Sequence, residues 1–214
     1  MVLRLLASLF VAAAAPAYHA SAQAVSPAVR AQIVASGHYH SGCPVPLSGL
    51  RVLTVSYWGF DGATHTGQLV VNENAAPKLS IVFRKLYALR FPIHHLAVSD
   101  VYGPHADQPA DGDVSGSFEC RQAVPSPCTG GTGTGSWSEH AYGEAVDLNP
   151  VENPYVGCGM TRDKTALSYL DRSRVRRGMV TPAVVAAFAS VGWGWGGSWS
   201  GSTKDYMHFS ASGH

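Results

Sequence analysis

Two short segments in the second half of the chain carry residue types that bind metal ions. The first, SEHAYGEAVD (residues 138–147), contains His140 and Asp147. The second, DYMHF (residues 205–209), contains His208. Two imidazoles and one carboxylate suit a catalytic zinc ion, because they leave a fourth coordination position for water. The residue types therefore predict a zinc site made of His140, Asp147 and His208.

A zinc site of this kind would support hydrolysis of a peptide bond. The metal would acidify the bound water and polarise the scissile carbonyl. Asp205, three residues before His208, would take the proton from the water and pass it to the leaving amine. The spacing leaves a structural alternative open, because His-x6-Asp is less specific than H-E-x-x-H. A histidine beside a phenylalanine is commonly an ordinary hydrogen-bonded residue, and DLNP after Val146 is compatible with a simple turn.

Strand alternation predicts how the first segment presents its ligands. Gly143 interrupts regular structure after His140, and residues 145–148 have the pattern of a strand. Val146 and Leu148 would then face the core, while Asp147 would face a cleft.

The second segment predicts the same arrangement on another strand. Met207 and Phe209 would share one face of the strand, and His208 would take the opposite face. Two strands would thus each present one ligand, and His140 would come from the loop before the first of them.

The preceding part of the chain has the pattern of a β-hairpin. Residues 52–57 form a period-2 run rich in strand formers. Residues 60–62, Phe-Asp-Gly, supply turn chemistry, and residues 67–71 fit the returning strand.

Two helices follow from apolar spacing and capping residues. The first would begin at Asn72 or Asn74 and end before Pro92, with one apolar face made of Leu79, Val82, Phe83, Leu86 and Tyr87. The second would begin at the cap Thr181 and end at Gly192. Between them, residues 93–98 predict a strand and residues 100–136 a long functional loop. The expected fold class is α+β, a small antiparallel sheet with flanking helices.

The N-terminus has the pattern of an export signal. Arg4 precedes an apolar run that is too short to span a bilayer, and Ala20-Ser21-Ala22 fits a signal peptidase site. We expect a signal peptide at 1–22, a lead-in segment with a short helix at 23–50, and a peptidase domain at 51–214. The protein would then be secreted or periplasmic. An N-terminal anchor helix is the alternative, although Pro16 interrupts the run.

Composition favours one packed domain and argues against a nucleic-acid partner. The 214 residues include 46% hydrophobic residues, enough for one sizeable core. Lys and Arg number 15 against 14 Asp and Glu, without the basic excess that nucleic-acid binding requires. After signal cleavage we expect no membrane association and a monomer.

Four cysteines in an exported chain favour two disulfides. They stand at Cys43, Cys120, Cys128 and Cys158. Three pairings are compatible with the sequence, and we weakly prefer Cys120 with Cys128, which would close a short Pro/Ser loop. A cysteine zinc site is a poor alternative, because the spacings contain no C-x-x-C pair.

The two metal-binding segments together resemble a known peptidase signature. SEHAYGEAVDLNP is similar to the S-x-H-x-x-G-x-A-x-D motif of LAS-type zinc peptidases, which include VanY-like D-Ala-D-Ala carboxypeptidases and phage L-alanyl-D-glutamate endopeptidases. WGWGGSW followed by DYMHF resembles the end of the same domain, and SFECR resembles the segment with its substrate-binding arginine. The resemblance spans roughly residues 50–210 and implies the hedgehog/DD-peptidase fold.

The resemblance also assigns roles to individual residues. It implies zinc bound by His140, Asp147 and His208, with Asp205 as the general base. Arg121 would bind the substrate's carbonyl or carboxylate and stabilise the tetrahedral intermediate. Ser138 would belong to the substrate-binding wall. Trp195 and Trp199 would either line the cleft or pack in the core.

The expected substrate is the peptide stem of peptidoglycan, and three function classes remain. The first is a zinc peptidase, with length and tail closer to the carboxypeptidases than to the endopeptidases. The second is a zinc-containing cell-wall binding module without activity, and the third is a structural domain without metal. Histidines outside the motifs are expected to be surface or packing groups: His38, His40, His65, His94, His95, His105 and His214.

Overall fold

The computed structural model describes residues 16–99 and 112–214. Its α-helices are α1 (Pro27–Ala35), α2 (Ala76–Ala88) and α3 (Pro182–Ala189). Short 3-10 helices are η1 (Leu47–Gly49), η2 (Glu139–Tyr142), η3 (Leu167–Leu170) and η4 (Gly196–Ser198). The strands are β1 (Ala20–Ala24), β2 (Leu50–Gly59), β3 (Thr64–Asn72), β4 (Pro92–Ile93), β5 (His95–Leu96), β6 (Val114–Ser115), β7 (Ala145–Asp147), β8 (Tyr155–Val156), β9 (Gly194–Trp195), β10 (Lys204–Asp205) and β11 (His208–Ser210).

The largest sheet is built on the predicted hairpin, which is confirmed as β2 and β3. Antiparallel strands run in the order β1-β2-β3, and the short β4 pairs with β2 in the parallel direction. The α+β class is therefore confirmed, with one parallel pairing in a sheet expected to be wholly antiparallel. The predicted strand at 93–98 is divided between β4 and β5, because the chain leaves the sheet at His94.

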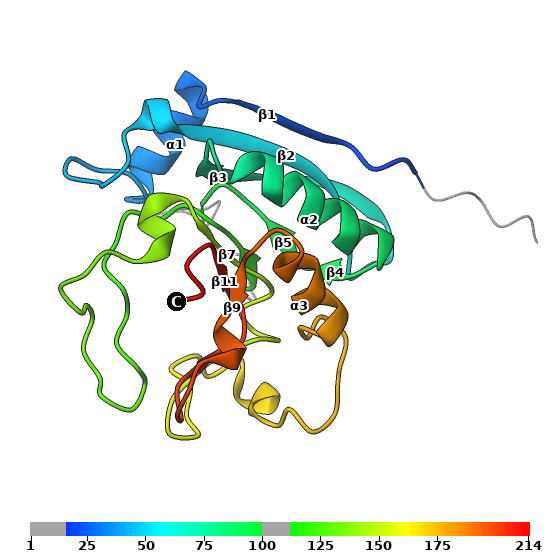
Figure 1. The fold of residues 1–214 in the computed structure, drawn as a ribbon, viewed down its shortest axis with the longest axis vertical. Helices are drawn as coiled ribbons and strands as arrows, with labels where there is room; N and C mark the ends of the chain where they lie inside the picture. Colours follow the sequence, from blue (N-terminus) through cyan, green and yellow to red (C-terminus); the bar gives the residue numbers. More distant parts are fainter. Residues whose placement is uncertain (1–15, 100–111) are drawn as a thin grey trace, which may run out of the picture.

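Both faces of this sheet are covered. Leu53, Val55, Leu69 and Val71 face α2, and the helix contributes the predicted apolar stripe. Figure 1 shows α2 lying along the sheet, with α3 below it in this view. The alternate residues of β2 and β3 pack with Ile33 of α1 and with Phe118 on the other face. Because successive residues of β2 and β3 face opposite sides and both sets are largely apolar, the sheet is buried on both faces.

Helix capping was predicted correctly for one helix and wrongly for the other. Thr181 caps α3, and its hydroxyl accepts a hydrogen bond from the Val184 N–H at 3.5 Å. The expected asparagine cap of α2 is wrong, because the N-cap is Ala75 and makes no side-chain hydrogen bond. Asn72 Oδ1 instead accepts from the Asn74 N–H at 3.0 Å, which closes a turn before the helix.

A smaller antiparallel sheet, in the order β7-β11-β9, carries two of the three candidate metal ligands, Asp147 and His208. Phe209 of β11 is fully buried, and its ring stacks on Phe188 of α3 with centroids 3.8 Å apart. Because strand neighbours face opposite ways, this anchor directs His208 away from the core. In Figure 1 the C-terminus lies beside β7 and β11.

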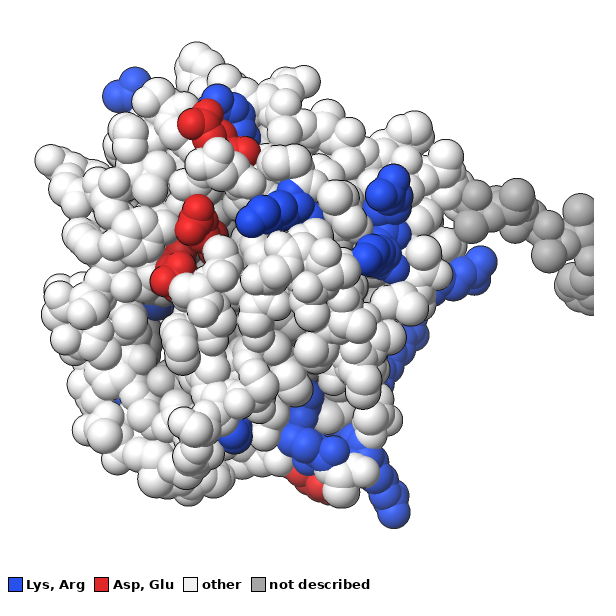
Figure 2. Space-filling model, viewed as in Figure 1, with Lys and Arg blue, Asp and Glu red and all other residues white. Residues whose placement is uncertain are grey.

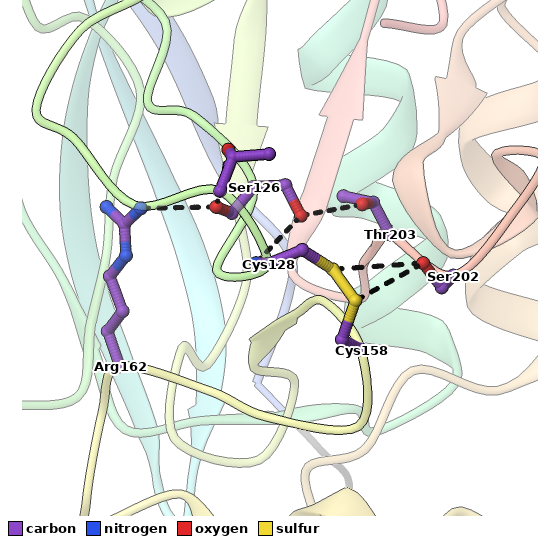
Figure 3. The surroundings of a disulfide bond; sticks show 7 residues. Ser126, Cys128, Cys158, Arg162, Ser202 and Thr203 are labelled. Atoms are coloured by element: carbon purple, nitrogen blue, oxygen red, sulfur yellow. Dashed lines mark hydrogen bonds between the residues drawn. A yellow bond between two sulfur atoms is a disulfide. The ribbon is translucent and has the colours of Figure 1, made fainter.

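The four cysteines form two disulfides, Cys43–Cys120 and Cys128–Cys158. The weak preference for Cys120 with Cys128 is therefore wrong. The first disulfide joins the lead-in to the segment that carries Arg121, and the second joins the following loop to the turn after β8. Around the second, the Ser126 and Thr203 hydroxyls lie 2.7 Å apart (Figure 3). The hydrogen bond between these hydroxyls holds the 125–128 loop next to the start of β10.

The N-terminal boundary stays a prediction. Residues 1–15 and 100–111, including parts of the predicted signal and long loop, lie outside the described residues. Ala20–Ala24 form β1, so cleavage after Ala22 would remove part of an exposed edge strand. None of the helices in the described part of the chain has the length and apolar composition needed to span a bilayer.

Candidate metal and active site

Asp147 and His208 lie directly opposite each other on the antiparallel strands β7 and β11. His208 Nδ1 is 3.2 Å from Asp147 Oδ1. Val146 and Leu148 are fully buried on the other side, as strand alternation predicted. Met207 differs from the prediction, since it precedes β11 and lines a cavity instead of sharing the core with Phe209.

His140 joins this pair from the 3-10 helix η2. Its Nε2 lies 3.1 Å from Asp147 Oδ2 and 3.2 Å from His208 Nδ1. The hydroxyl of Ser138 caps η2 by accepting a hydrogen bond from the His140 N–H. Gly143 ends η2 with φ of 68°, and a Cβ there would lie 2.6 Å from the Asn72 N. A glycine is therefore required to turn the chain from η2 into β7.

Outer hydrogen bonds determine which nitrogen of each histidine faces the site. His140 Nδ1 lies 2.5 Å from the Ser117 carbonyl, to which it donates, so that Nε2 is left as the ligand atom. His208 Nε2 lies 3.2 Å from the His214 carbonyl, so Nδ1 is left as the ligand atom. Both histidines are more than nine-tenths buried. These contacts fix the rings before any metal binds.

The charges in the site match a cation. Burial would raise the pKa of Asp147, but His140 and His208 hold that pKa well below its usual range. Burial would lower the pKa of His208, but its hydrogen bond to Asp147 raises that pKa overall. Asp147 is therefore ionised at neutral pH, as a metal ligand must be.

Asp205 lies in β10, which pairs with β8, and contributes a second carboxylate to the same cavity. Its Oδ1 is buried and accepts no hydrogen bond from the described residues. Burial, with the Asp147 charge adding to it, raises the pKa of Asp205 to about 7. A Cβ on Gly196 would lie 2.8 Å from Asp205 Cβ, so the close packing of β10 needs this glycine. Asp205 is thus a carboxylate that exchanges a proton near neutral pH.

Arg121 supplies the cation of the cavity. Its Nε donates to Glu119 Oε2 at 2.5 Å, which orients the guanidinium. Burial opposes the charge, but Glu119, and then Asp147 and Asp205, raise the pKa of Arg121. Arg121 is therefore a fixed positive group near two carboxylates. Glu119 was not identified from the sequence, although it stands two residues before Arg121 in the quoted SFECR segment.

A cavity of about 390 Å³ brings together the candidate catalytic, substrate-binding and metal-ligating residues: Arg121, Ser138, His140, Asp147, Asp205 and His208. Trp199 lines the cavity, whereas Trp195 packs on the core and donates its indole N–H to the Tyr206 carbonyl. His214 was expected only at the surface, but it also lines the cavity. Figure 2 shows that most of one molecular face is uncharged, with Lys and Arg side chains scattered over it and few Asp or Glu.

The donor set fits zinc. His140, Asp147 and His208 offer two nitrogens and one oxygen, all within 4.8 Å of one another. Pairwise spacings near 3.2 Å are those expected for ligands about 2.0–2.1 Å from one tetrahedral ion. The outer hydrogen bonds to both histidines also follow the usual pattern of zinc sites.

A family model described as D-alanyl-D-alanine carboxypeptidase matches residues 132–211. The match confirms the resemblance to VanY-like peptidases and indicates a peptidase. It contains the three candidate ligands and Asp205, while Arg121 and Glu119 lie before it. No curated protein and no solved structure matches the chain, so the hedgehog/DD-peptidase fold stays a prediction.

Proposed function

We propose, from this family relationship, that the protein is a zinc metallopeptidase that removes the terminal D-alanine from peptidoglycan stem peptides. The observation that carries the proposal is the convergence of two histidines, two carboxylates and one arginine on a single cavity. The carboxylates have opposite environments: the pKa of Asp147 is lowered, whereas that of Asp205 is raised to about 7. Such a separation assigns one carboxylate to charge and the other to proton transfer.

The mechanism divides the work between these groups. When bound, zinc would supply a Lewis acid and lower the pKa of the attacking water. Asp205 takes the proton of that water and delivers it to the amine that leaves. Arg121, held by Glu119, binds the C-terminal carboxylate of the stem peptide or the charge that develops on the scissile carbonyl. Ser138 and Trp199 form walls that hold the peptide beside Asp205.

An endopeptidase that cuts within the stem is a second candidate. A further cavity of about 270 Å³ is also lined by His140 and Asp147, together with Ser117 and Glu119. Space on two sides of the candidate ligands favours a substrate that continues beyond the scissile bond.

For either activity, we propose that the protein acts outside the cytoplasm, because two disulfides accompany the signal-like N-terminus.

Mass spectrometry of a synthetic stem pentapeptide ending in D-Ala-D-Ala separates these activities. The carboxypeptidase releases one alanine, whereas the endopeptidase releases the fragment beginning at D-glutamate. Amidating the C-terminus should slow the carboxypeptidase strongly, because Arg121 then loses its carboxylate partner. Neither product from the zinc-loaded protein, with pentapeptide and cross-linked peptidoglycan both offered, would refute the proposed activity and leave the binding module.

A further inference from the structure

A second group of metal-binding residue types lies outside the cavity described above. His94 Nε2 lies 3.3 Å from Glu152 Oε1 and 3.4 Å from Asp113 Oδ2. The donor atoms of the three residues all lie within 4.8 Å of one another. These spacings are close to the 3.1–3.2 Å found among His140, Asp147 and His208.

The three side chains come from segments that the fold holds in place. His94 stands where the chain passes from β4 to β5, and its backbone N–H donates to Asn149 Oδ1. Asp113 immediately precedes β6, and its Oδ1 accepts from the Val151 N–H at 3.1 Å. Glu152 lies in the turn after β7 and accepts a hydrogen bond from the Tyr169 hydroxyl through Oε1. The donor atoms are therefore positioned by main-chain and side-chain contacts before a ligand arrives.

Two of the three side chains are buried carboxylates. The side chains of Asp113 and Glu152 are 1% and 4% exposed. Glu152 Oε2 is buried and accepts no hydrogen bond from the described residues. A buried carboxylate oxygen left in this way is unfavourable. Two buried carboxylates and one imidazole thus converge at one point, and a cation placed there would satisfy Glu152 Oε2.

We propose that His94, Asp113 and Glu152 bind a divalent transition-metal ion, most simply zinc, at a second site. The imidazole nitrogen disfavours calcium and magnesium, which prefer oxygen ligands. The other candidate group, His40 with Cys43 and Cys120, is unsuitable because both cysteines are in a disulfide.

The ion at this second site would have a structural role. It would tie the β4–β5 junction to β6 and to the turn after β7. Gly116, one residue after β6, bridges to Asp147, and Ser117 holds His140. The second site would thereby support the segments that orient the candidate active-site ligands.

Metal counting tests the site without reference to peptidase activity. Tag-free protein is stripped with a chelator, dialysed against buffered zinc and measured by elemental analysis. We expect two zinc equivalents in the wild type, one in His140→Ala and one in Glu152→Gln. His65→Gln is the matched control, because His65 makes an exposed pair with Asp61 at 3.0 Å, and it should retain two equivalents.

A thermal measurement covers the case in which Glu152→Gln does not fold. Zinc should raise the Tm of His140→Ala, and this rise should disappear in His140→Ala/His94→Gln, because His94 is partly exposed and its replacement disturbs the core less. One equivalent in the wild type and none in His140→Ala would overturn the second site. A zinc-dependent rise in Tm that persists without His94 would overturn it as well.

Discussion

His208 Nδ1 lies 3.2 Å from Asp147 Oδ1 across neighbouring strands, at directly paired positions of β11 and β7. Paired positions in an antiparallel sheet fix the distance between two side chains more firmly than a loop does. The stacking of Phe209 on Phe188 holds the strand face that presents His208. The geometry of the candidate metal site is thus a property of the sheet, and in the proposed mechanism Asp205 and Arg121 act around it.

Asp205→Asn should separate metal binding from catalysis. The amide cannot take the proton of the attacking water, so kcat should fall by about 10²–10⁴-fold. Zinc content should stay unchanged, because Asp205 is not one of the three ligands. Asp163→Asn, at an exposed carboxylate, is the control and should keep full activity. Equal kcat in Asp205→Asn and wild type would show that another group is the base.

The stability of metal-free protein should reveal the raised pKa of Asp205. The folded-state pKa is about 7 and the ordinary value 3.8, so the unfolded chain ionises first as the pH rises. The Asp205 contribution to stability is complete below about pH 4, falls between pH 4 and 7, and then levels off. Above pH 7, Asp205→Asn should be more stable than wild type by on the order of 1–3 kcal/mol.

Urea unfolding at pH 4 and pH 8 measures this difference. At pH 4 wild type and Asp205→Asn should be similar in stability, because the carboxyl is then largely protonated in the folded state. The comparison removes the opposite contribution of Asp147, which both proteins share. An identical difference at the two pH values would mean that Asp205 titrates normally.

Glu119→Gln should weaken substrate binding through Arg121. The variant loses the charge that orients the guanidinium at 2.5 Å, so KM should rise several-fold while kcat changes less. Glu73→Gln is the matched control, because Glu73 also binds an arginine at 2.5 Å, namely Arg51, which does not line the cavity. Steady-state kinetics on the stem pentapeptide measures both parameters. A fall in kcat with unchanged KM would assign Arg121 to the developing charge instead of the terminal carboxylate, and no change in either parameter would contradict the positioning role.

Replacing Cys43 and Cys120 by serine should lower stability more than it lowers zinc affinity. This disulfide joins positions 77 residues apart, and loop entropy assigns such a bridge about 4 kcal/mol. The candidate zinc ligands lie on η2, β7 and β11, and neither cysteine of this disulfide belongs to these elements. Thermal unfolding and zinc titration of the double variant test the two statements. Loss of zinc binding in a folded variant would show that the bridge shapes the site directly.

The elements with a strong local pattern were predictable from sequence. The β2–β3 hairpin and α3 with its Thr181 cap follow from residue spacing and turn chemistry, and the alternation in β7 placed Asp147 opposite the core. The cap of α2 was missed because the Asn72 side chain accepts a hydrogen bond in the turn that precedes the helix. Met207 was placed on a strand that begins one residue later.

Long-range contacts were not predictable from one sequence. Disulfide pairing depends on which distant segments meet, and Cys43 reaches Cys120 only because the lead-in packs near Phe118. Similarly, the sequence around His94 gives no indication that Asp113 and Glu152 lie next to it in the fold. The same limit applies to the carbonyls of Ser117 and His214, which orient the two candidate zinc ligands without any signature of their own.

The most direct test of the central claim is chelation followed by zinc restoration, with release of D-alanine from the stem pentapeptide as the readout. Purified protein should lose activity with its metal and regain it with zinc, whereas His208→Ala should stay inactive at any zinc concentration that leaves it folded. Activity that survives complete metal removal would contradict a zinc peptidase built on His140, Asp147 and His208.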